Sequence, residues 1–154
     1  MLQCTILSAP AMRLAPTNAG LQGGNVVAAH FWCIVAAWVV VYLTKLPVAA
    51  AMHRAGGYDN HHPRAQQAAL TGWGARALAA HQNGFETFAP FAAAVLVAHA
   101  VGAPDGLVTG LAVLFVVSRV AYVACYIADL SSLRSAVWGV GFLATLGLFA
   151  LPLL

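Results

Sequence analysis

Four long apolar runs dominate this 154-residue sequence and limit what it can fold into. About 20 consecutive apolar residues span a bilayer as a helix, and the four runs leave no room for a separate soluble domain. Only 7% of the residues are charged, against about 25% in an average soluble domain. Such a chain cannot cover a water-soluble surface, and its apolar content also excludes a disordered protein. We therefore predict an all-α, integral membrane four-helix bundle.

The boundaries of the runs predict one domain over residues 25–154. Its helices are expected at about 26–51, 66–100, 106–128 and 135–153. Residues 1–24 are polar and contain Gly, Pro and Asn, so we expect a flexible N-terminal leader. The first run is long for a signal peptide and is interpreted as a membrane helix, with cleavage near residues 49–51 as the alternative.

Basic residues in the short loops predict how the bundle lies in the membrane. Arg54 and Arg64 belong to the loop between the first two helices, and Arg134 belongs to the loop between the last two. The turn at residues 102–105 has no basic residue. Because basic loops stay in the cytoplasm, we expect both basic loops there and both termini outside it.

Glu86 and Arg119 are charged residues inside apolar runs. A charge near the bilayer centre costs at least about 2.5–3.5 kcal/mol on insertion scales, and it persists when it is paired or faces a polar cavity. The second and third helices are joined by a tight turn, so both residues lie about 20 Å from the outer end. We predict an opposite-charge pair at one level. The alternative is a clamp that serves only helix packing.

Other polar side chains recur at helical spacing on the faces that carry this pair. Together they predict a polar column between the second, third and fourth helices that opens to the cytoplasm. Its members are Arg76, Asn83, Glu86, Arg119, Tyr122, Tyr126 and Arg134. Arginines, an amide and phenols in one column suit an anionic, peptide-like ligand.

Charge and cysteine patterns exclude other partners. The net charge is only +3 and no basic stripe is present, so nucleic acid is not an expected partner. Cys33 and Cys125 lie inside apolar runs without a CxxC spacing and are interpreted as small buried hydrophobes. His30 and His99 are expected near the outer membrane interface, and no metal site is expected.

Three segments resemble the MAPEG family, the membrane-associated proteins in eicosanoid and glutathione metabolism. Residues 83–91 (NGFETFAPF) match an N-x-x-E motif followed by an aromatic residue and proline. Residues 119–126 (RVAYVACY) match R-x-x-Y-x-x-x-Y, and residues 134–138 (RSAVW) match the Arg-Ser start of the fourth helix. Residues 58–65 are similar to a loop of bacterial members. The resemblance covers about residues 26–154.

This resemblance implies a homotrimer, in a bacterial inner membrane, that binds glutathione between adjacent subunits near the cytoplasmic face. By position, Arg134 resembles the arginine that stabilises the glutathione thiolate, which is the nucleophile. It is therefore the candidate catalytic residue. The resemblance assigns the peptide backbone of glutathione to Asn83, Glu86, Tyr122 and Tyr126, with Arg119 as the partner of the glutamate. Arg76 and Ser135 complete the candidate binding residues. Lipophilic electrophiles would arrive from the membrane lipids, which implies a transferase or peroxidase activity.

One position departs from the pattern of the glutathione-binding members. They usually place an arginine four residues before the motif's asparagine, where this chain has Ala79, and Gln82 directly precedes Asn83. Arg76, one turn earlier, is the long side chain that could reach the site instead. The departure supports a second hypothesis, a non-catalytic membrane module that binds lipid or organises a partner without glutathione. A transporter is a weaker third, because no inverted repeat or broken-helix pair is evident.

Overall fold

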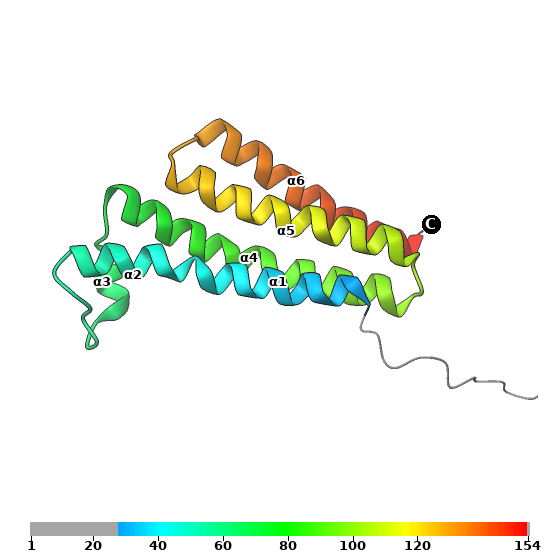
Figure 1. Cartoon of the computed structure of the whole chain (residues 1–154), viewed down its shortest axis with the longest axis horizontal. Coiled ribbons are helices and arrows are strands. Elements are labelled where there is room, and N and C mark those ends of the chain that lie inside the picture. The colour runs from blue at the N-terminus through cyan, green and yellow to red at the C-terminus, as the bar shows by residue number, and fades with distance from the viewer. Residues whose placement is uncertain (1–27, 154) are drawn as a thin grey trace, which may run out of the picture.

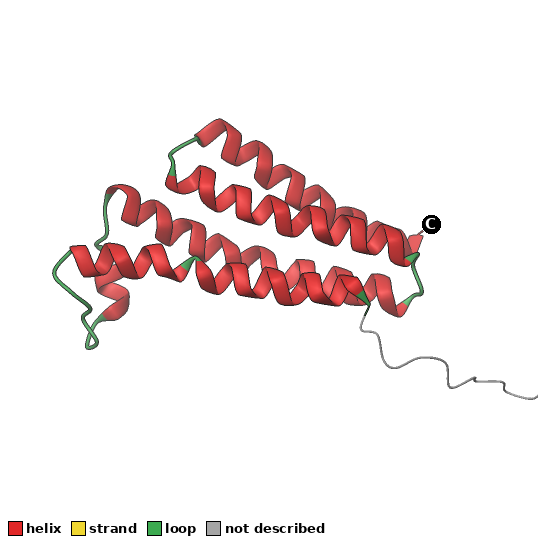
Figure 2. Ribbon diagram, in the orientation of Figure 1, coloured by secondary structure: helices red, strands yellow, loops and turns green. Residues whose placement is uncertain are grey.

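The computed structural model describes residues 28–153, and every regular element in that range is a helix (Figures 1 and 2). The elements are α1 (Ala29–Leu43), α2 (Lys45–Arg54), α3 (Pro63–Ala68), α4 (Gly72–Ala100), α5 (Asp105–Ile127), α6 (Ser131–Ala150) and the short 3₁₀ helix η1 (Leu151–Leu153). The predicted all-α class is confirmed. The predicted leader over residues 1–24 lies outside the described residues.

Three helical segments are long and apolar enough to cross a membrane, namely residues 29–54, 105–127 and 131–153. The fourth long helix of the bundle, α4, has 29 residues and carries three of the seven polar side chains of the predicted column. At 1.5 Å per residue it is about 44 Å long, longer than the ~30 Å hydrocarbon core. The four long segments lie side by side in Figure 1.

The first membrane segment is a helix with a break at Thr44. Pro47 lacks an N–H, and its ring clashes with the carbonyl four residues earlier, that of Leu43. The helical hydrogen bonding is therefore interrupted between α1 and α2. The Thr44 hydroxyl donates to the Val41 carbonyl at 2.5 Å and lies 2.8 Å from Nδ1 of His81 on α4. The break thus links this segment to α4 through polar side chains.

The second long helix begins later than the sequence predicted. Residues 63–68 form the separate helix α3, and α4 begins only at Gly72, whose φ is +56°. That left-handed conformation is open to glycine but not to most other residues. The Ala and Gln residues before Gly72 favour a continuous helix, which is why the prediction started at residue 66.

The two helix hairpins close with the same backbone motif. After α4, Gly102 with φ +74° and Ala103 both donate N–H bonds of 3.0 Å to carbonyls of the last helical turn. After α5, Asp129 with φ +64° and Leu130 do the same, at 3.2 and 2.9 Å. This left-handed cap satisfies the free carbonyls of a helix end. The tight turns make α5 antiparallel to both α4 and α6, and the antiparallel arrangement of the second and third long helices is as predicted.

The main apolar core lies between α1, α4, α5 and α6. The rings of Phe91 on α4 and Phe115 on α5 are buried and stacked, with centroids 3.9 Å apart and planes 5° from parallel. Cys33 and Cys125 are buried free thiols, which confirms their interpretation as small hydrophobes. Large apolar side chains such as Leu143 are exposed on the outside of the bundle, where lipid or another subunit would cover them.

Candidate functional site

Arg119 is a buried arginine of α5 at the place where three helices meet. Its side chain is 5% exposed. Nη1 donates to Oδ1 of Asn83 on α4 and Nη2 donates to the Trp138 carbonyl on α6, both at 3.4 Å. The guanidinium also lies over the rings of Tyr122 at 4.9 Å and Phe115 at 5.4 Å, which adds cation–π attraction. Neutral groups from all three helices therefore hold this buried charge.

The predicted ion pair between Glu86 and Arg119 does not form among the described residues, because Asn83 lies between them. The Asn83 amide nitrogen donates to Oε2 of Glu86 at 3.0 Å, while its oxygen accepts from Arg119. One amide can do both at once. The Trp138 carbonyl draws the guanidinium toward α6, and the carboxylate is exposed on α4. The predicted direct contact of the two charges is therefore wrong, and Asn83 links them instead.

A polar cavity of about 260 Å³ lies beside the first turns of α6. It is lined by Tyr122, Tyr126, Arg134, Ser135 and Trp138. The Arg134 guanidinium lies 4.4 Å from the centre of the Tyr126 ring, and within residues 28–153 it forms no salt bridge. The two tyrosine rings meet edge to face at 5.4 Å. The cavity thus brings together a cation, two phenols and a serine hydroxyl.

A second cavity of about 290 Å³ lies between α4 and α6. Asn83, Glu86, Thr87 and Thr145 form its polar part, whereas most of its wall is apolar and includes Phe142 and Phe149. Trp138 lines both this cavity and the polar one. The predicted column is therefore divided into a polar cavity and a largely apolar cavity, with Arg119 buried beside them.

Arg76 lies apart from both cavities. Its Nη1 is 3.4 Å from Oδ2 of Asp129, and its Nη2 donates to the Ile127 carbonyl at 3.5 Å. It lines neither cavity. A cation at the C-terminal end of α5 interacts favourably with the helix dipole, so Arg76 stabilises the α5–α6 hairpin. Its role in ligand binding stays a prediction.

Sequence reasoning missed two residues of the site. A Cβ atom at Gly141 would lie 2.5 Å from Nη2 of Arg119 and 2.5 Å from Oγ of Ser118, so only glycine leaves room for the buried guanidinium. Gly141 follows Arg134 by two helical turns, and this spacing on one face is a signal that could have found it. Trp138 acts through its backbone carbonyl, which no side-chain pattern reveals.

Comparison with protein-family models shows which family the chain belongs to. The family model of the MAPEG family matches residues 29–154, which includes every helix and every residue of the two cavities. No curated protein matches the sequence. Together with the three membrane-capable helices, the match shows an integral membrane protein that belongs to a family of the glutathione-related transferase and peroxidase type. The chain therefore belongs to the MAPEG family.

Proposed function

We propose that this protein is a glutathione-dependent transferase or peroxidase that acts on lipophilic electrophiles. The observation that carries the proposal is the position of Arg134 in the polar cavity. Its guanidinium lines a space of about 260 Å³ beside two tyrosines, and no carboxylate among the described residues neutralises it. A cation in such a place stabilises a thiolate, and the thiolate is the reactive form of a thiol.

Each residue of the site has a proposed role. Arg134 is the catalytic residue that stabilises the thiolate, whose sulfur donates an electron pair to the electrophile. Hydroxyls of the polar cavity and the amide and carboxylate of α4 bind the peptide part of glutathione, and Arg119 positions Asn83. The proposed binding residues are Arg76, Asn83, Glu86, Arg119, Tyr122, Tyr126 and Ser135. To reach the ligand, Arg76 must leave both the Asp129 carboxylate and the Ile127 carbonyl.

We propose a homotrimer in a bacterial inner membrane, with the basic loops in the cytoplasm and both termini outside it. Sites for small ligands enclose about 300–1,000 Å³, and the polar cavity of one subunit, about 260 Å³, is smaller. This supports a site that a neighbouring subunit completes. The largely apolar cavity of about 290 Å³ would receive a lipophilic substrate from the surrounding lipid.

Glutathione added to the purified protein is expected to produce the ultraviolet difference absorbance of a thiolate, and Arg134→Ala is expected to remove it. The reason is that the variant takes away the only cation lining the described polar cavity. Arg54→Ala is the matched control, because Arg54 lies over the Trp73 ring at 5.2 Å and does not line that cavity. A wild-type protein without the signal, or an Arg134→Ala variant that keeps it, would contradict the proposed role.

Two observations favour the second function, a non-catalytic membrane module that binds lipid or a partner. Ala79 stands at the position where the resemblance expects an arginine, and Arg76 is engaged by Asp129 and the Ile127 carbonyl. Both reduce the cations available for the carboxylates of glutathione.

A thermal shift separates the two functions. If the protein binds glutathione, a concentration 100 times the Kd stabilises the folded state by about 2.7 kcal/mol. We therefore expect a saturable rise in melting temperature with glutathione, and no rise with the same concentration of glutamate. A melting temperature that glutathione leaves unchanged would favour the non-catalytic module.

A further inference from the structure

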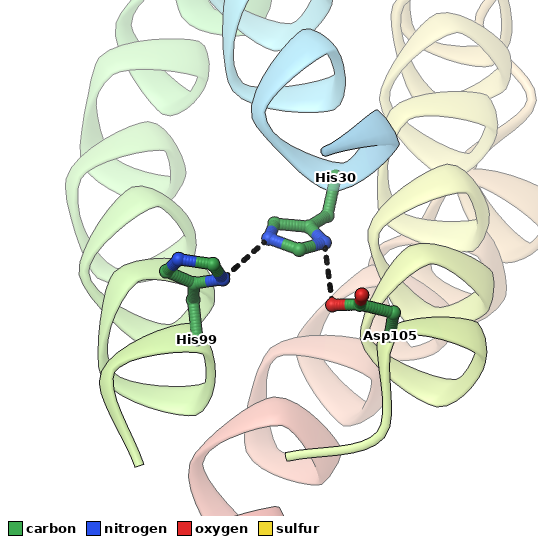
Figure 3. Close-up of side chains that lie close together, drawn as sticks. All are labelled: His30, His99 and Asp105. Carbon is green, nitrogen blue, oxygen red and sulfur yellow. Dashed lines mark hydrogen bonds and ion pairs between the residues drawn. The ribbon is translucent and has the colours of Figure 1, made fainter. Parts of the chain in front are cut away.

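A second polar cluster lies at the end of the bundle opposite to the start of α6 (Figure 1), the helix that carries Arg134 in its first turn. His30 belongs to the first turn of α1, His99 to the last turn of α4 and Asp105 to the first turn of α5. The tight turn between α4 and α5 brings His99 and Asp105 together, and α1 begins beside them. Figure 3 shows the His30 ring between the other two side chains.

His30 is the fixed centre of this cluster. Its side chain is fully buried, at 0% exposure, and its Nε2 lies 3.1 Å from Nδ1 of His99. Its Nδ1 is 3.8 Å from Oδ1 of Asp105, which is too long for a hydrogen bond, and has no hydrogen-bond partner among the described residues. A buried polar atom without a partner is costly. This nitrogen points at a carboxylate and calls for an explanation.

We propose that the cluster binds one divalent transition-metal ion, with Zn²⁺ as the best match. Two imidazoles and a carboxylate form a ligand set that zinc uses, with a water molecule in the fourth position. Here each residue offers one donor atom, and the three atoms lie within 4.8 Å of one another. A single ion can therefore contact all of them after a modest contraction.

The three donor atoms can move closer around an ion only if some of these residues are exposed and free to move. Metal–nitrogen bonds of about 2.0–2.1 Å in a tetrahedron place the donor atoms about 3.4 Å apart. His99 is exposed, and the side chain of Asp105 is 78% exposed, so both can close on an ion held by the buried His30. The Phe31 ring packs against both histidines, at 4.6 Å from His30 and 4.7 Å from His99, and limits their orientations.

The charge of the cluster also favours a divalent metal ion. With both histidines neutral, the cluster has one negative charge from Asp105, and it presents nitrogen and oxygen donors that suit a doubly charged ion. The sequence alone predicted no metal site, because its two histidines are 69 residues apart and Asp105 looks like a helix-start residue. Only the folded arrangement brings the three together.

Cobalt provides the test, because Co²⁺ in a zinc-type site absorbs visible light. We expect the full-length protein, purified without a histidine tag, to bind one Co²⁺ per chain and to release it on addition of Zn²⁺. His99→Gln and Asp105→Asn are each expected to weaken Co²⁺ binding at least about tenfold. The matched control is His62→Gln, because His62 lies 3.7 Å from Asp59 in an exposed histidine–aspartate pair. The His62→Gln variant is expected to bind Co²⁺ as tightly as the wild type.

The test uses variants of the exposed His99 and Asp105, because replacement of the buried His30 could prevent folding. Melting curves without metal show whether the His99 and Asp105 variants are folded. A wild-type protein that binds no Co²⁺, or variants at both positions that bind it as tightly as the wild type, would overturn the proposal. Neither result depends on whether glutathione binds at the other end of the bundle.

Discussion

Replacing Gly141 with alanine is expected to lower the free energy of unfolding by about 2 kcal/mol, because overpacking a tight contact costs about 1–3 kcal/mol. The new Cβ would lie 2.5 Å from both Nη2 of Arg119 and Oγ of Ser118. Arg119 cannot move away freely, since it is buried and bonded to Asn83 and to the Trp138 carbonyl. Unfolding in mixed micelles with increasing SDS measures the change.

Gly139→Ala is the matched control on the same helix. A Cβ at Gly139 meets nothing within 4 Å among the described residues. An alanine inside a helix is more stable than a glycine by about 0.5–1 kcal/mol, so this variant is expected to be at least as stable as the wild type. If Gly141→Ala matched it, the space around the Arg119 guanidinium would not be the constraint that the structure indicates.

The helices and their order could be predicted because their signals are local. Long apolar runs fix the membrane segments, and a glycine that can take a left-handed conformation ends α4 at a tight turn. Once α4 and α5 are antiparallel, counting residues from that turn places Glu86 and Arg119 at one level. In the structure Arg119 bonds to Asn83, one helical turn before Glu86 on α4.

The finer features depend on side-chain and backbone geometry that no spacing encodes. The sequence cannot show that the Asn83 amide lies between the two charges, or that a backbone carbonyl of Trp138 accepts from Arg119. It also cannot show that Arg76 turns toward the end of α5. The contact between His30 and His99 joins chain segments far apart in sequence, so it needs the whole fold.

Asn83→Leu is expected to lower the free energy of unfolding by about 2–3 kcal/mol, because hydrogen bonds to charged groups are worth about 1.5–3 kcal/mol. The variant leaves the buried Arg119 guanidinium without its α4 partner, although the bond to the Trp138 carbonyl remains. SDS titration again gives the change. Gln82→Leu is the control, since Gln82 is the exposed neighbour of Asn83 and its replacement is expected to stay within about 0.5 kcal/mol.

A double-mutant cycle with Arg119→Met tests whether the two residues act together. Replacing both partners of a buried polar contact by apolar side chains of similar size is often neutral or stabilising, whereas removing one partner is costly. We therefore expect the double variant to recover most of the stability that Asn83→Leu loses, with a coupling energy of about 2 kcal/mol. Additive effects would show that Asn83 does not stabilise the buried cation. A double variant as stable as the wild type would show that the fold does not require the Arg119–Asn83–Glu86 chain.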